Sequence, residues 1–225
     1  MTVHVQVDVE RVGATRPSKA ILFYGSRFAS VHDIVDNALG AGQPLGTKAL
    51  RDALEALHGA SLEWLPWNVL AYGGKRLVWF EPPQPRALFF ETQDKALNAL
   101  SGGVFPLPGL VFEANERSLK VWAFRGEGRP ARDEPICVAP FFNTSRGAVC
   151  LGSMRRPDTF DASTGEAWSS SYFAAAFTHH TQPGALSSFP GSPSELWLEA
   201  QSRSRFEPEW LVPTGQSLEA VIQRG

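Results

Sequence analysis

The segment of residues 137–152 places the strongest constraint on the fold, because it carries both cysteines of the chain but has no helical pattern. Gly147 and Gly152 lie on either side of Cys150, and Pro157 prevents a helix from forming directly after it. The sequence therefore predicts that Cys150 lies on extended or loop backbone. A thiol in such a position is expected to be accessible to solvent.

The two cysteines have different neighbours and different expected roles. Cys137 lies between Ile136 and Val138 on a predicted strand, which favours a place in the core. From its residues alone, Cys150 has two interpretations. It is either a small buried hydrophobic residue, as free cysteines commonly are, or a nucleophile that forms a covalent intermediate.

The composition is typical of a folded globular chain. Of the 225 residues, 43% are hydrophobic. We expect one domain over residues 1–225, with strands and helices at 1–60, a β meander and the cysteine segment at 61–160, and helices at 161–225. The net charge of −2 does not favour binding to nucleic acid or to an anionic membrane. The N-terminus is unlike a signal peptide, so the two cysteines indicate reduced thiols in the cytoplasm.

Hydropathy patterns predict strands and helices along the whole chain. The N-terminal part contains predicted strands at 3–9 and 20–24, a helix that Ser30 caps, and a second helix that begins at Thr47 and ends near residue 59. The C-terminal third contains helices with capping-box patterns at Ser163 and Ser192, and a short last helix at 217–223. Between them, the predicted strands lie at 68–72, 76–80, 86–91, 110–113 and 119–124, with a short helical run at 96–100. Gly73-Gly74 predicts that the first two of these strands form a hairpin.

The sequence Gly-Ala-Val-Cys-Leu at residues 147–151 resembles the active-site segment of ubiquitin-conjugating enzymes, in which Gly-x-Ile/Val-Cys-Leu follows His-Pro-Asn. Pro140 and Asn143 match the first half loosely, because two phenylalanines separate them and no histidine precedes Pro140. A bacterial branch of this family lacks that histidine, and the chain is similar to it over residues 19–222. Within the branch, it resembles the group encoded in the PRTRC cassette.

The resemblance implies a mixed α/β (α+β) protein with the UBC-like fold. Such a fold has an antiparallel β meander, an extended active-site cysteine segment and C-terminal helices, here preceded by an N-terminal strand and helix extension. The implied activity is that of a transferase, which carries a ubiquitin-like protein as a thioester on Cys150 and passes it to an amine. The implied partners are a ThiF-like adenylating enzyme, the ubiquitin-like protein and a JAB-type metalloprotease of the same cassette. Because the sequence has no Gly-x-x-x-x-Gly-Lys-Ser/Thr loop, we expect ATP to be used by the adenylating partner and no cofactor here.

Two further residues are candidates for this chemistry. The side-chain amide of Asn143 is expected either to stabilise the oxyanion of the transfer step or to hold a turn. His179 is expected to take a proton from the incoming amine. The alternative for the pair His179 and His180 is a cap at the end of the preceding helix, whose predicted apolar face includes Tyr172 and extends to Phe177.

Other functions use some of the same residues. One alternative is a UBC-like module without activity that only binds a ubiquitin-like protein or an activating enzyme. A second is a cysteine hydrolase with Cys150 and His179, although hydrolases of that class often place the cysteine at a helix N-terminus. A zinc site of Cys137, Cys150, His179 and His180 lacks the usual spacing of two to four residues between paired cysteines.

Overall fold

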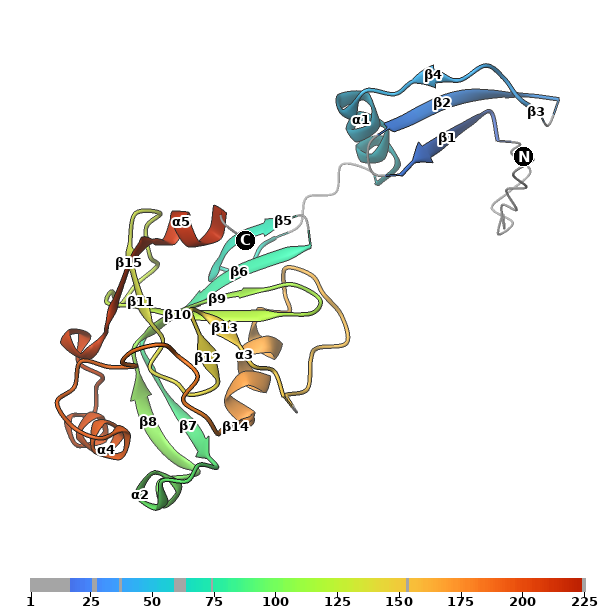
Figure 1. Cartoon of the computed structure of the whole chain (residues 1–225). Coiled ribbons are helices and arrows are strands. Elements are labelled where there is room, and N and C mark those ends of the chain that lie inside the picture. The colour runs from blue at the N-terminus through green and yellow to red at the C-terminus, as the bar shows by residue number, and fades with distance from the viewer. Residues whose placement is uncertain are drawn as a thin grey trace. The chain divides into compact units, whose positions relative to one another are not determined.

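The computed structural model describes residues 17–25, 28–36, 38–58, 64–73, 75–152 and 154–223. Contacts divide the chain into two compact units, with the boundary between Glu63 and Trp64 (Figure 1). The sequence analysis treated residues 1–60 as the N-terminal part of a single domain, and the prediction of one domain over the whole chain stays a prediction. The strand predicted at residues 3–9 lies outside the described residues.

The first unit is a small antiparallel sheet followed by one helix. Strand β1 (Lys19–Tyr24) pairs with β2 (Phe28–Val35), and β2 also pairs with the two-residue strands β3 (Ala38–Leu39) and β4 (Gln43–Pro44). Helix α1 (Thr47–His58) follows. The predicted strand at 20–24 and the predicted helix at Thr47 are therefore confirmed.

The helix predicted after Ser30 is wrong, because these residues form strand β2. Val31 lies opposite Ile21 in the antiparallel register, and the Ser30 hydroxyl contacts His32 Nε2 at 2.8 Å instead of capping a helix. The β-branched residues Val31 and Ile34 favour a strand over a helix. Over such a short apolar run, helical spacing and strand pairing are hard to tell apart from the pattern alone.

A large sheet forms the centre of the second unit (Figure 1). Its strands run in the order β12-β13-β10-β9-β6-β5, and β11 pairs with both β10 and β15. The predicted hairpin at 68–80 is confirmed, with Gly73 opposite Arg76, while Gly74 lies outside the described residues. The strands are β5 (Val69–Gly73), β6 (Arg76–Glu81), β9 (Gly109–Ala114), β10 (Leu119–Phe124), β11 (Pro135–Val138), β12 (Thr144–Ser145), β13 (Ala148–Val149) and β15 (Pro213–Ser217).

A second, smaller sheet consists of β7 (Gln84–Phe90), β8 (Gly103–Leu107) and β14 (Ala176–Phe177). Strand β14 pairs parallel to β7, with Ala176 opposite Phe89. The short helix α2 (Lys95–Asn98), capped by the Asp94 carboxylate, connects β7 to β8. The sequence analysis predicted β7 and α2 but not β8.

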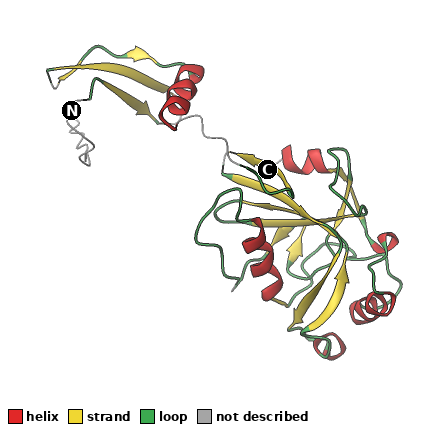
Figure 2. Ribbon diagram, turned by 180° about the vertical axis from the view of Figure 1, so that it is seen from behind, coloured by secondary structure: helices red, strands yellow, loops and turns green. Residues whose placement is uncertain are grey.

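Three α-helices lie in the C-terminal third, as predicted: α3 (Gly165–Ala174), α4 (Pro193–Arg203) and α5 (Leu218–Gln223) (Figure 2). A 3₁₀ turn, η1 (Pro208–Trp210), lies between α4 and β15. The capping box of Ser192 and Glu195 is confirmed. The one at Ser163 is wrong, because the Ser163 hydroxyl donates to the Asp161 carboxylate instead. Among the described residues, no helix is both long enough and apolar enough to cross a membrane.

Helix α3 is shorter than its predicted apolar face. It ends at Ala174, and Phe177 belongs to strand β14. The backbone changes from helix to extended at Ala175, so that the next two residues complete the edge of the smaller sheet. The periodicity continued through this change because Phe177 is buried in the same core as the helix.

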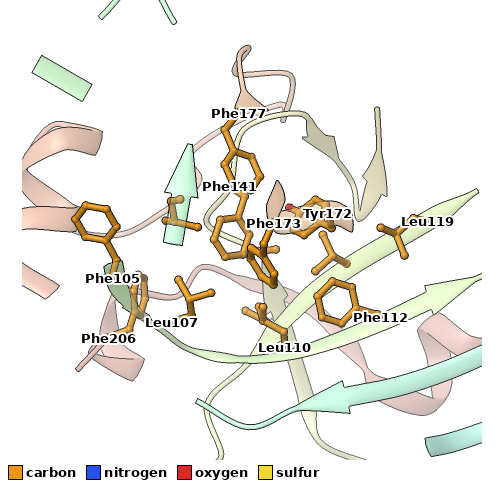
Figure 3. Close-up of a cluster of buried hydrophobic side chains, with 14 of the residues drawn as sticks. Phe105, Leu107, Leu110, Phe112, Leu119, Phe141, Tyr172, Phe173, Phe177 and Phe206 are labelled. Carbon is orange, nitrogen blue, oxygen red and sulfur yellow. The ribbon is translucent and has the colours of Figure 1, made fainter. Parts of the chain in front are cut away.

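Aromatic side chains fill the core beneath the cysteine segment (Figure 3). Phe141 stacks on Phe177 with ring centroids 5.4 Å apart and on Trp197 at 5.8 Å, and it meets Tyr172 edge-on at 5.9 Å. This cluster joins the cysteine segment to α3, β14 and α4. A separate apolar cluster on β6, β9, β10 and β11, which includes Phe80 and Trp122, packs against α5.

Replacing Phe141 with alanine tests this cluster. We expect Phe141→Ala to lower the free energy of unfolding by about 3–5 kcal/mol, because a fully buried ring leaves a cavity. Phe89→Ala is the matched control, since Phe89 is 40% exposed, and it should change stability far less. Urea unfolding measures both, and equal losses in the two variants would contradict the central place of Phe141.

Candidate active site

Cys150 directly follows a tight hairpin of β12 and β13. Thr144 pairs with Val149 across this hairpin, and the turn residues Arg146 and Gly147 both have left-handed backbone, with φ of 51° and 88°. Left-handed backbone at both central residues is what a two-residue hairpin turn of type I′ requires. A Cβ atom on Gly147 would also lie 2.5 Å from the Trp122 indole nitrogen, so no other residue fits. Cys150 therefore lies on non-helical loop backbone just after β13, as predicted.

The structure separates the two cysteines as the sequence analysis predicted for Cys137. The Cys137 side chain is 1% exposed and belongs to the main core, whereas Cys150 is exposed to solvent. Burial raises the pKa of the Cys137 thiol, and the nearby Arg125 opposes this effect only in part. Cys137 is thus kept as a neutral thiol in the core, and Cys150 is the accessible one.

Asn143 connects the cysteine segment to the chain after β14. Its backbone is left-handed, with φ of 60°, a conformation that Asn tolerates better than most residues. Its N–H donates to the His179 carbonyl oxygen at 2.8 Å, and its carbonyl oxygen accepts the Cys150 N–H, also at 2.8 Å. Asn143 therefore links the backbone of Cys150 directly to that of His179.

The side chain of Asn143 also binds the chain after β14. Its Nδ2 donates to the Ala176 carbonyl oxygen at 2.9 Å. Its Oδ1 accepts the N–H of Thr178 at 3.1 Å, the Thr178 hydroxyl at 2.8 Å and the His179 N–H at 3.0 Å. These contacts are those of a residue that holds a turn, and the oxyanion role of Asn143 stays a prediction.

The three candidate residues from the sequence line one cavity of about 190 Å³. Cys150 and Asn143 come from the cysteine segment, and the exposed His179 comes from the chain after β14. Tyr172 of α3 and Phe177 also line the cavity and belong to the aromatic core (Figure 3). The structure thus brings together a thiol, an amide and an imidazole that are up to 36 positions apart in the chain.

Sequence reasoning missed two polar residues of this cavity. Tyr172 was assigned only to an apolar helix face, but among the described residues its buried hydroxyl has no hydrogen-bond partner, and burial raises its pKa. Thr178 received no role, although its hydroxyl lies 2.6 Å from His179 Nδ1. Its place directly before a candidate base was the available signal.

The helix-cap interpretation of the histidine pair is wrong, because α3 ends at Ala174 and the pair follows strand β14. The two imidazoles also differ in position. The His180 ring packs edge-on against Phe142, with centroids 5.9 Å apart, and lines a different cavity. Only His179 shares a cavity with Cys150.

Charged and metal-binding groups contribute little around Cys150. Arg146, Arg155 and Arg156 are all exposed, so water screens their effect on the thiol. The described residues contain no group of three or more His, Cys, Asp or Glu side chains arranged to hold a metal ion.

The exposure of the two thiols makes a direct prediction for alkylation. We expect iodoacetamide to modify Cys150 in the folded protein well before Cys137, whose thiol is buried and whose raised pKa reduces its thiolate fraction. Peptide mass analysis after timed labelling measures the two rates. Urea-unfolded protein is the control, because both thiols should then react alike. Equal rates in the folded protein would contradict the assignment of Cys150 as the accessible cysteine.

The contacts of Asn143 predict a loss of stability on substitution. Asn143→Ala removes four side-chain hydrogen bonds and places alanine in left-handed backbone, so we expect unfolding to cost about 2–4 kcal/mol less. Asn115→Ala is the matched control, because Asn115 Oδ1 accepts two backbone N–H groups in a turn between β9 and β10. Only Asn143→Ala should also change the alkylation rate of Cys150. Unchanged stability would favour the oxyanion role.

Comparison with known proteins identifies the family of the chain. The family model for prokaryotic E2 family D matches residues 47–214, from the start of α1 into β15. No curated protein and no solved structure matches the chain. The mixed α+β architecture with antiparallel sheets is consistent with an E2-like fold, as the sequence predicted. The match covers well over half of the 225 residues, so the chain belongs to prokaryotic E2 family D.

Proposed function

We propose that this protein accepts a ubiquitin-like protein as a thioester on Cys150 and passes it to an amine. Family membership supports a function of the ubiquitin-conjugating kind in general. The observation that carries the specific proposal is the exposed thiol of Cys150, held on a tight hairpin beside a cavity that His179 also lines. An acyl carrier needs such an accessible thiol, because it must attack one thioester and later present another.

The proposed chemistry has two steps. In the first, the Cys150 sulfur forms a bond to the acyl carbon of a thioester on a partner, and the partner's thiol leaves. In the second, an amine attacks the new thioester, an amide forms and the Cys150 thiol is released. Cysteine is suited to both steps, because a thiolate is a good nucleophile and a better leaving group than an alkoxide.

The proposed partners follow from this chemistry. The chain has no phosphate-binding loop of the Gly-x-x-x-x-Gly-Lys-Ser/Thr type, so a separate enzyme must activate the acyl group with ATP. We propose a ThiF-like adenylating enzyme as the donor and a ubiquitin-like protein as the cargo. A JAB-type metalloprotease and membership of the PRTRC group are further parts of the proposal that the family resemblance implies.

A binding module without activity is the second candidate. The observation in its favour is the Asn143 side chain, whose amide nitrogen and oxygen are both used to hold residues 176–179. A module of this kind would bind a ubiquitin-like protein or an activating enzyme through the same fold. It does not require an exposed cysteine, however, and Cys150 is exposed.

A charging assay with cysteine variants tests the proposed function. We expect an adduct on Cys150 only when the adenylating partner, ATP and the ubiquitin-like protein are all present, and a thiol reductant should cleave it. Cys150→Ser should form an oxyester that resists the reductant, and Cys150→Ala should form no adduct. Cys137→Ala is the control with an intact Cys150. Non-reducing electrophoresis measures each adduct.

Either of two outcomes would contradict the proposed transferase function. One is a wild-type chain that stays uncharged while the adenylating partner loads itself. The other is an adduct on wild type that Cys150→Ala retains. Binding of the ubiquitin-like protein without any adduct would establish the binding module in its place.

A further inference from the structure

Three polar groups form a hydrogen-bonded series that ends at His179. The Thr178 hydroxyl lies 2.8 Å from Asn143 Oδ1 and 2.6 Å from His179 Nδ1. Thr178 lies half-buried between the two, and its backbone N–H also donates to Asn143 Oδ1. The family match and the proposed function leave this threonine without a role.

Backbone partners determine which way the Asn143 amide faces. Its Nδ2 faces the Ala176 carbonyl oxygen, which only accepts hydrogen bonds. Its other end faces the N–H groups of Thr178 and His179, which only donate. Exchanging the two ends of the amide would break all three contacts, so the atom that faces the Thr178 hydroxyl is the oxygen Oδ1.

The orientation of the Asn143 amide determines where the hydrogens of the Thr178 hydroxyl and the His179 imidazole lie. Asn143 Oδ1 is an acceptor, so the single hydrogen of the Thr178 hydroxyl points to it. The hydroxyl oxygen is then left with lone pairs toward His179 Nδ1, and that nitrogen must carry a hydrogen to make the 2.6 Å contact. In neutral imidazole only one nitrogen is protonated, so Nε2 of His179 keeps its lone pair.

We propose that Thr178 is a positioning residue, which holds His179 in the tautomer whose Nε2 can take a proton from an amine that attacks the Cys150 thioester. This inference rests on the proposed function. His179 is exposed and lines the same cavity as Cys150, where an acyl group on the sulfur would lie. Among the described residues, the other titratable side chains that line this cavity are Cys150 and Tyr172, and this part of the lining contains no Asp, Glu, Lys or Arg.

In the transfer step, the acyl group moves from the Cys150 sulfur to the amine. The amine nitrogen forms a bond to the thioester carbon, and its proton moves to His179 Nε2. The carbon–sulfur bond breaks, and Cys150 leaves as a thiolate. The imidazolium returns the proton to the thiolate, so that the products are an amide, a neutral thiol and the starting tautomer of His179. No oxidant, reductant or metal ion is needed.

The tautomer is measured directly by two-bond ¹H–¹⁵N correlation spectra of the histidine rings, in protein without any partner. We expect wild-type His179 to carry its hydrogen on Nδ1, and Thr178→Ser to keep this state because serine retains the hydroxyl. Thr178→Val has nearly the same shape but no hydroxyl, and it should shift His179 toward the Nε2–H form. His180 is the internal reference and should not change. A wild-type His179 with its hydrogen on Nε2 overturns the inference.

A single-turnover assay tests the role in transfer. Cys150 is charged with the small thioester of an acetyl-glycyl-glycine peptide, and free lysine is the amine. We expect His179→Ala to slow discharge about 100-fold and Thr178→Val about tenfold, with Thr178→Ser close to wild type. Thr214→Val is the control, because Thr214 lies on β15 and its hydroxyl donates to the carbonyl oxygen of Ile136 on β11.

The double variant separates positioning from general stability. If Thr178 acts through His179, Thr178→Val should have no further effect in the His179→Ala protein. An equal loss in both backgrounds would make Thr178 merely structural and overturn the inference. If the wild-type Cys150 accepts no acyl group at all, the proposed function and the base role fail together, while the spectra still decide the tautomer. If charging succeeds and His179→Ala discharges like wild type, only the base role is lost.

Discussion

The stacking of Phe141 on Phe177 is the contact on which the candidate site depends. Phe141 belongs to the cysteine segment and Phe177 to β14, and both rings are buried in one aromatic core (Figure 3). Asn143 lies two residues after the first ring, and Thr178 directly after the second. Because burial holds the two rings together, the polar residues that follow them meet at the surface.

The polar contacts above this core then have little freedom. Asn143 binds three residues of the second segment, Ala176, Thr178 and His179, through its side chain and backbone. It also accepts the backbone N–H of Cys150. One asparagine therefore holds Cys150, Thr178 and His179 in fixed positions relative to one another. This geometry explains why an Asn is useful here even if it never contacts a reacting carbonyl group.

The sequence was informative where short-range chemistry decides the structure. The hairpin at Gly73, the capping box of Ser192 and the non-helical backbone around Cys150 all follow from turn and cap preferences that act over a few residues. The helix expected after Ser30 failed because an apolar run of that length fits either spacing. Its state was decided by pairing with β1, which lies before it in the chain.

The residues alone determined that Cys150 lies on non-helical backbone, that Cys137 lies in the core and that the second unit is rich in antiparallel strands. The residues also suggested Asn143 and His179 as candidate site residues, but they did not predict the distance between the two. Only the tertiary structure decided that His179 shares a cavity with Cys150 while His180 faces Phe142, and that Thr178 links Asn143 to the imidazole. The reason is physical: these contacts join segments about 35 residues apart, and burial of the aromatic core sets them, whereas local preferences extend over a few residues only.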